Sequence, residues 1–263
     1  MLRHSTISSS SLPWLRDDSS QTILMSSDQN AGVSLLDYPH RGKVAQLAEI
    51  SVFLFLIAPS LIFSFFYIKQ GSSSFALTAI FTILRDLALV SLISYFMWRN
   101  GEPPVRIGWT RHGWPREVLL GLLLFAPLSF GAATLEAGLR HIGFHVPKTP
   151  LPALVPGRSV TQSAMALVLV AVVAWSEETI FRGYLILRLK SVTGSTASAV
   201  LLSSIIFSIG HGYEGSAGVL TVGAMGLVLA LVYVWRKSLL APMVMHFLQD
   251  FVAILLIPLL RAK

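Results

Sequence analysis

The stretch "SAMALVLVAVVAWSEETIFRGYLILR", Ser163 to Arg188, places two adjacent glutamates and an arginine inside a long apolar run. A membrane-spanning helix needs roughly 20 mostly apolar residues, and this stretch is longer than that. A charged side chain at membrane depth costs about 2.5–3.5 kcal/mol on insertion scales. The stretch therefore predicts a membrane helix whose ionisable residues, Glu177, Glu178 and Arg182, serve either a function or a salt bridge within the protein.

The rest of the chain has the same apolar character. Of its 263 residues, 54% are hydrophobic and 13% are charged, with a mean hydropathy of +0.68, whereas soluble domains carry about 25% charged residues. We therefore expect an all-α, polytopic transmembrane bundle of about seven or eight helices with a buried polar active site. The predicted spans are 44–68, 75–97, 117–139, 163–188, 196–213, 216–235 and 239–260. The proline-rich segment 141–162 predicts an extended loop or a short re-entrant piece, and an eighth helix there stays open.

Charge and cysteine content exclude several classes of function. The net charge is +7, but the basic residues lie mostly between apolar runs, which favours membrane topology over nucleic-acid binding. The chain has no cysteine, so disulfides, thiolate zinc sites and cysteine nucleophiles are excluded. With a cytoplasmic N-terminus, twelve loop Lys and Arg residues fall inside and six outside, so this orientation is favoured. The inner set is Arg3, Arg16, Arg41, Lys43, Arg99, Arg106, Arg111, Arg116, Arg188, Lys190, Arg236 and Lys237, and the outer set is Lys69, Arg140, Lys148, Arg158, Arg261 and Lys263.

Helical geometry sorts the ionisable residues of the predicted spans. Glu178 and Arg182 are four residues apart and can pair along one face. Glu177 points about 100° away from Glu178 on an α-helix and needs a partner elsewhere. The predicted spans contain two further pairs of ionisable residues. His246 and Asp250 share a face of the last span, whereas the adjacent Arg85 and Asp86 are each expected to find a separate partner.

Three of these residues are predicted to lie inside the membrane, and their distances can be measured from the same membrane surface. At 1.5 Å per residue, Glu177 lies about 16 Å, His211 roughly 20 Å and His246 on the order of 9 Å from the same predicted membrane surface. We therefore expect these side chains and Asp250 to converge on one buried pocket. Such a set can activate a water, with Glu177 as the base. It can also hold a divalent metal such as zinc, with Glu177, His211, His246 and Asp250 as ligands. Either way, the expected reaction is hydrolysis of a membrane-borne substrate, above all a peptide bond.

Three short motifs carry a resemblance to a known family. They are "EETIFR" at Glu177–Arg182, "FSIGH" at Phe207–His211 and "HFLQD" at His246–Asp250. In this order, with one in each apolar span, they resemble the motifs of the CAAX protease and bacteriocin-processing family of intramembrane proteases, which includes the Ras-converting CAAX prenyl endopeptidases. The resemblance covers about 163–260.

The resemblance implies a role for each motif residue. Glu177 would be the general base, and His211 would help to position the water. His246 and Asp250 would stabilise the oxyanion or complete a metal site, and Glu178 and Arg182 would support Glu177. The family has Asn or Asp at the position of Asp250. An Asn amide can donate to an oxyanion, whereas an ionised Asp cannot. A divalent metal would offset Glu177 and Asp250 together, and this favours the metal-assisted form over the metal-free one, which stays open.

The resulting prediction is a multi-pass membrane endopeptidase of CAAX prenyl protease type, in which a glutamate activates a water either with or without the help of a metal. Its partners would be the lipid bilayer and a membrane-associated peptide or protein, either prenylated or of the bacteriocin type, and no nucleic acid. The predicted organisation is a disordered Ser-rich tail at 1–43, accessory helices and loops at 44–162, and the catalytic helical core at 163–263. Two alternatives remain, a transporter or proton- or ion-binding protein, since proton relays use the same residue types, and a peptide-binding scaffold without turnover.

Overall fold

The computed structural model describes residues 42–64, 74–147, 155–157 and 159–261, and in these ranges the regular structure is all helical. The Ser-rich tail predicted at 1–43 lies almost entirely outside the described residues. The long helices are α1 (Lys43–Ser64), α2 (Phe75–Arg99), α3 (Trp114–His141), α4 (Val160–Glu177), α6 (Thr196–Ile209), α7 (Gly215–Arg236) and α8 (Leu240–Asp250). Two of them continue through π-helical segments, α4 through η5 (Glu178–Leu185) into α5 (Ile186–Thr193), and α8 through η7 (Phe251–Leu256) into α9 (Ile257–Arg261).

Seven helical rods therefore form the described part of the chain, and their places agree with the seven predicted spans. Five are long and apolar enough to cross a membrane, namely 75–99, 114–141, 160–193, 212–236 and 240–260. The apolar helix α6 is shorter. The predicted all-α transmembrane bundle is confirmed, and the protein is an integral membrane protein.

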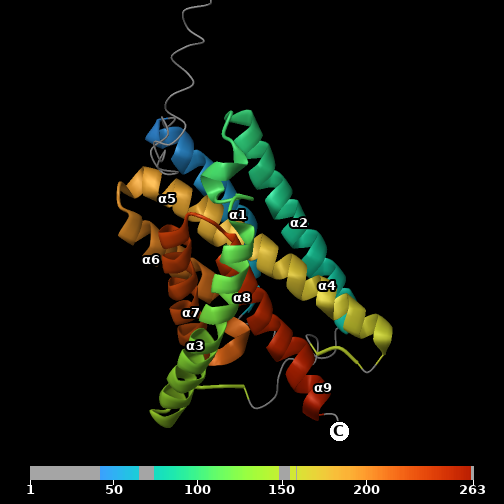
Figure 1. Ribbon diagram of the computed structural model, residues 1–263. Coiled ribbons are helices and arrows are strands. Elements are labelled where there is room, and N and C mark those ends of the chain that lie inside the picture. The colour runs from blue at the N-terminus through green and yellow to red at the C-terminus, as the bar shows by residue number, and fades with distance from the viewer. Residues whose placement is uncertain (1–41, 65–73, 148–154, 158, 262–263) are drawn as a thin grey trace, which may run out of the picture.

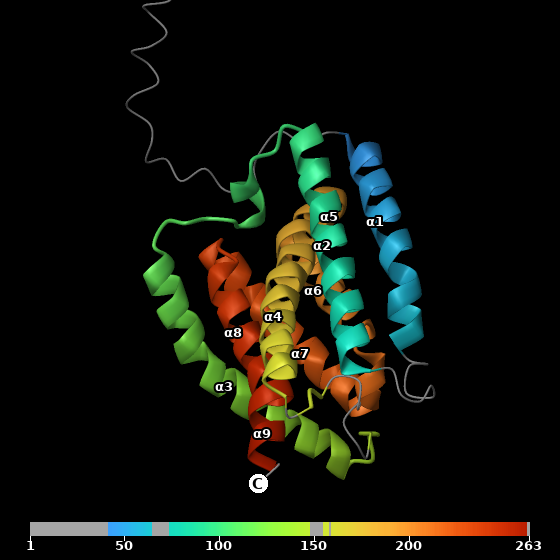
Figure 2. The ribbon, with the colours of Figure 1, turned by 90° about the vertical axis from the view of Figure 1, so that its right-hand side faces the viewer.

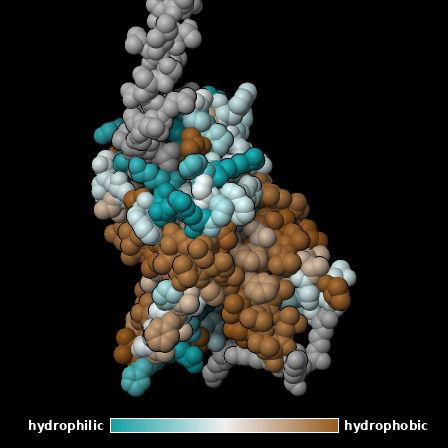
Figure 3. All heavy atoms as spheres, viewed as in Figure 1, coloured by the Kyte–Doolittle hydropathy of each residue, from teal (hydrophilic) through white to brown (hydrophobic). Residues whose placement is uncertain are grey.

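Successive rods run in opposite directions between two ends of the molecule (Figures 1 and 2). The start of α1, the ends of α2 and α5 and the start of α3 lie at one end, and the C-terminus lies at the other. An apolar belt separates more polar ends on the face seen in Figure 3. The described basic residues predicted to be cytoplasmic lie at the starts of α1 and α3, at the ends of α2, α5 and α7 and between α2 and α3, so we name the end of the molecule where α1 begins the basic end.

Serine residues precede several helices, and a glycine ends one of them. Ser74, Ser159 and Ser195 each precede a helix and accept a hydrogen bond from the backbone N–H three residues later, which satisfies one free donor of the first turn. Gly194 ends α5 with φ of 72°, a left-handed conformation that favours glycine. The sharp break between α5 and α6 follows from this residue.

A buried ionic network holds the basic end together. Arg188 of α5 donates through Nη1 to Glu102 Oε1 at 2.9 Å, and Arg106 Nη1 meets the same oxygen at 2.6 Å. Glu49 of α1 accepts from Asn100 at 2.7 Å and lies 3.2 Å from Arg188 Nη2. Glu49 is only 5% exposed, so it is not the interfacial residue that its place near a predicted span end suggests. The network joins α1, α5 and the loop between α2 and α3.

The first prediction tests which end faces the cytoplasm. His112 and Arg140 are exposed near opposite ends of α3, and the chain has no native cysteine. With the N-terminus inside, His112→Cys labels with a membrane-impermeant thiol reagent only after the cells are opened, and Arg140→Cys labels on intact cells. The reverse pattern would invert the orientation.

The second prediction concerns the ionic network. Glu102→Gln should lower the free energy of unfolding by about 3–5 kcal/mol, because the buried guanidiniums of Arg188 and Arg106 lose the carboxylate that they share. Thermal unfolding in detergent measures this change. Arg111→Gln, an exposed change at the same end, is the control and should melt close to the parent. Equal melting of both variants would show that the network adds little to stability.

Candidate active site

The two glutamates of the opening stretch lie at a change of helix type. Glu177 is the last residue of α4, and Glu178 begins the π-helical segment η5. Asp250 likewise ends α8, directly before the second π-helical segment η7. π-helical turns are rare, and they occur often at functional sites. Both helices that carry candidate catalytic carboxylates therefore leave α-helical geometry at those residues.

Arg182 is almost completely buried, at 1% exposure. Its Nη1 donates to Glu178 Oε1 at 2.8 Å, so the predicted pair is present. Its Nη2 donates to the carbonyl oxygen of Gly226 on α7 at 3.3 Å, and its guanidinium stacks 4.1 Å from the centre of the Phe207 ring. A Cβ atom at Gly226 would lie 2.9 Å from Phe207 Cδ1 and 3.2 Å from Arg182 Nη2, so the bare backbone there makes room for both side chains.

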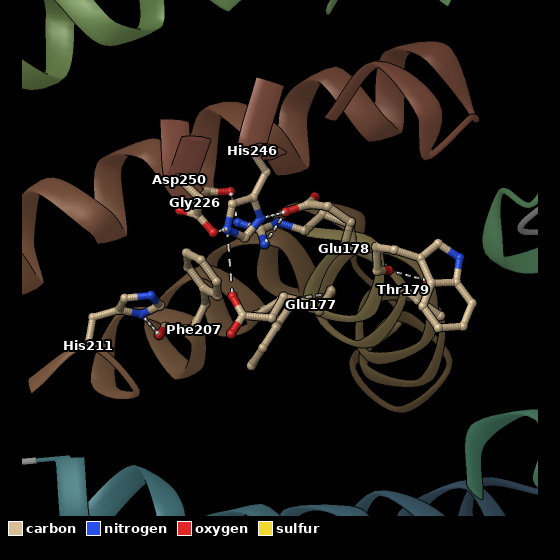
Figure 4. Close-up of polar contacts among 12 residues, drawn as sticks. Glu177, Glu178, Thr179, Phe207, His211, Gly226, His246 and Asp250 are labelled. Carbon is tan, nitrogen blue, oxygen red and sulfur yellow. Dashed lines mark hydrogen bonds and ion pairs between the residues drawn. The ribbon is translucent and has the colours of Figure 1, made fainter. Parts of the chain in front are cut away.

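His246 is the residue on which three carboxylates meet (Figure 4). Its Nδ1 lies 2.8 Å from Glu178 Oε1, and its Nε2 lies 3.7 Å from Glu177 Oε2 and 3.6 Å from Asp250 Oδ2. An ionised carboxylate only accepts, so Nδ1 carries the proton that is donated to Glu178. Glu178 is thus more than the partner of Arg182, because both adjacent glutamates contact the same imidazole. The expectation that Glu177 and Glu178 serve different faces assumed an α-helix throughout.

Glu177 keeps one oxygen free of any hydrogen bond. Its Oε2 is buried and has no hydrogen-bond partner among the described residues, while its side chain as a whole is 15% exposed. Asp250 is 26% exposed at the side chain. The Glu177 carboxylate therefore lies in a largely buried place with one acceptor available for a further donor such as a water.

His211 lies beside this group and is separated from it by one aromatic ring. Its ring centre is 4.7 Å from that of Phe207, which in turn packs edge-on against His246 at 6.0 Å (Figure 4). Its Nδ1 is 3.0 Å from the Phe207 carbonyl oxygen, an acceptor, so the proton sits on Nδ1. The structure thus brings Glu177, His246 and Asp250 into direct contact and places His211 next to them.

The candidate metal ligands do not form a metal site in this structure. Among the described residues, no group of three or more His, Asp or Glu side chains is arranged to hold a metal ion. His246 Nδ1 is already bonded to Glu178, and His211 lies beyond the Phe207 ring. We therefore derive no reaction step through a metal.

Sequence reasoning misjudged one pair that lies near the site. Arg85 and Asp86 of α2 were expected to find separate partners, but Arg85 Nε and Nη2 lie 2.8 and 2.7 Å from Asp86 Oδ1. The long arginine side chain can fold back on its neighbour, which the angle between adjacent residues does not reveal. Asp86 is 1% exposed and interacts electrostatically with Glu177. The feature of the sequence that pointed to this pair is the presence of two opposite charges, Arg85 and Asp86, at membrane depth.

A comparison with protein families identifies a family whose members resemble part of this chain. The model of the type II CAAX prenyl endopeptidase Rce1-like family matches residues 159–252. These residues form an Rce1-like domain of the type II CAAX prenyl endopeptidases. The resemblance read from the three motifs is confirmed. Searches of curated proteins and of solved structures find no match to the chain.

The matched region begins just before α4 and ends just after Asp250, so the Rce1-like domain contains all six motif residues. Helices α1 to α3 lie outside it. They nevertheless touch it closely, since α2 packs along α4 and α3 packs along α8. A Cβ at Gly121 of α3 would lie 2.7 Å from Val244 Cβ, which shows how near α3 comes to the helix of His246.

The third prediction concerns Glu178. Glu178→Gln should lower the free energy of unfolding by about 3–5 kcal/mol, because the Arg182 charge stays buried without its carboxylate. Thermal unfolding in detergent is the measurement. Glu177→Gln is the matched control and should melt near the parent, since Glu177 has no close cationic partner. A Glu178→Gln variant as stable as that control would contradict the role of the pair.

Proposed function

We propose that the protein is an intramembrane endopeptidase in which Glu177 activates a water to hydrolyse a peptide bond. The observation that carries this proposal is the free, buried oxygen of Glu177 beside His246 and Asp250. An acceptor without a donor at this depth is costly unless a further group occupies it. A water at that oxygen is held ready for proton transfer. The Rce1-like domain supports the same reading.

The proposed reaction uses one general base, Glu177, and one peptide carbonyl group, which the water attacks. Glu177 accepts a proton from the water, and the oxygen of the water forms a bond to the peptide carbonyl carbon. The carbonyl oxygen takes the negative charge of the tetrahedral intermediate. The protonated Glu177 then gives its proton to the amide nitrogen as the C–N bond breaks, which releases an amine and a carboxylic acid, and the acid can pass its proton to the amine. Atoms and charge balance without a further reactant.

The surrounding residues position the reacting groups. Glu178 accepts from His246 Nδ1 and fixes the direction of the imidazole, so that Nε2 points at Glu177 and Asp250. His211 has its proton on Nδ1, and its Nε2 lone pair can accept from a water. Arg182 holds Glu178 in place from the buried side.

We propose further that the peptide substrate carries a hydrocarbon chain, as a prenylated peptide does. A cavity of about 300 Å³ lies between α3, α7 and α8. Leu124, Leu128, Val228 and Met245 are among its apolar lining residues, and Thr221 adds one hydroxyl. Met245 precedes His246 in the chain, so the cavity adjoins the helix that bears the imidazole. An apolar chain in this cavity would anchor the peptide beside Glu177.

The fourth prediction tests the proposed function on purified protein. The parent should cleave a quenched peptide that carries a farnesyl chain, and the same peptide with a small alkyl cap should react at least tenfold more slowly. Glu177→Gln should abolish cleavage, because the amide cannot accept the proton, while the protein still melts like the parent.

The remaining outcomes decide between the alternatives. Tight peptide binding without turnover would identify a scaffold, and proton or ion flux in proteoliposomes without cleavage would identify a transporter. Full activity after exhaustive chelation supports the metal-free base. Loss on chelation with recovery on added Zn²⁺ would replace that mechanism by the metal-assisted one.

A further inference from the structure

Two stripes of side chains run side by side along α8 and face different surroundings. Met245 lines the apolar cavity between α3, α7 and α8, whereas His246 and Asp250 lie beside the carboxylate and imidazole groups of the site. On an α-helix, residues four apart point about 40° apart, and residues three apart point about 60° apart. Gln249 follows Met245 by four positions and His246 by three, so its direction lies between those of the two. The shortest path along α8 from the cavity to the imidazole therefore runs past Gln249.

The side-chain amide of Gln249 is held at the wall of this cavity. Ser129 of α3 donates from Oγ to Gln249 Oε1 at 2.8 Å, and Ser129 directly follows Leu128, which lines the cavity. Gln249 Nε2 lies 3.8 Å from the sulfur of Met225, a further lining residue on α7. The amide thus lies where three helices meet, and its contacts to α3 and α7 fix its position.

The nitrogen of this amide can donate to a bound molecule. A side-chain amide carries two N–H groups, and the thioether sulfur of Met225, to which Nε2 donates, is a weak acceptor. Gln249 is half-buried, so a ligand can reach it. A peptide carbonyl oxygen is a stronger acceptor than a thioether sulfur. A substrate backbone in apolar surroundings needs such a donor, because a buried carbonyl without a hydrogen bond is costly.

We propose that Gln249 is a substrate-binding residue, which donates from Nε2 to a backbone carbonyl oxygen of the peptide beside the residue that carries the hydrocarbon chain. This inference rests on the proposed peptidase function and its lipid cavity. The carbonyl oxygen replaces the Met225 sulfur as the acceptor, while Ser129 keeps its bond to the amide oxygen. The cavity holds the chain and Gln249 holds the peptide where the chain joins it. The two contacts together determine which peptide bond lies at Glu177.

The fifth prediction compares Gln249→Met with Ser129→Ala on the farnesylated peptide. Methionine is close to glutamine in shape and has no donor, so Gln249→Met should raise KM about tenfold with kcat within about threefold, as for the loss of one buried hydrogen bond. Ser129→Ala is the matched control, because it removes the same bond between α3 and α8 but leaves both N–H groups of the amide. Its KM should stay within about threefold of the parent value. Equal KM values in the two variants would reduce Gln249 to a contact between helices.

Binding in a Glu177→Gln background separates this inference from the proposed function, because it does not depend on cleavage. Gln249→Met should weaken binding of the farnesylated peptide about tenfold. Farnesyl methyl sulfide, which has the hydrocarbon chain and no peptide, should bind equally well with either residue at position 249. A parent that cleaves the peptide, with unchanged peptide affinity in Gln249→Met, overturns the role of Gln249 alone. An equal loss of peptide and sulfide affinity also overturns it, since the variant then damages the cavity. A tenfold loss of peptide affinity alone, in a protein whose parent cleaves nothing, supports Gln249 and overturns the peptidase.

Discussion

The site depends on one buried chain of charge, which runs from Arg182 through Glu178 to His246. A guanidinium at 1% exposure is tolerable only because a carboxylate, a carbonyl and an aromatic face surround it. The same Glu178 oxygen that accepts from Arg182 lies 2.8 Å from His246 Nδ1. One oxygen thus couples the rod of α4, η5 and α5 to α8, and Arg182 extends the coupling to α7. The contact of Glu178 with His246 sets the direction of the imidazole.

The adjacent glutamates share one imidazole at the place where α4 passes into the π-helical segment η5. On an α-helix, Glu177 and Glu178 point about 100° apart. At the start of η5 the turn widens, and both carboxylates reach His246 from one side of α8. The second widening, after Asp250, occurs on the facing rod at the same level. The rods therefore deviate from regular geometry where three carboxylates have to fit around one ring.

Much of the fold could be predicted from the sequence, because a membrane helix is recognised from its length and its apolar content alone. All seven rods lie within a few residues of their predicted spans. The contact of Glu178 with Arg182 followed from their spacing. The contact of Glu178 with His246 did not, because spacing along one helix says nothing about the neighbouring helix.

The balance of charge around Glu177 limits what the pocket can do. Carboxylates at Glu177, Glu178, Asp250 and Asp86 outnumber the guanidiniums of Arg182 and Arg85, and each guanidinium is paired with one carboxylate of its own helix. Glu177 and Asp250 are left facing the same imidazole nitrogen. An oxyanion formed there meets two negative groups unless a donor stands between them and the substrate. A site built mainly from acceptors activates water readily, and it needs added donors to stabilise the intermediate.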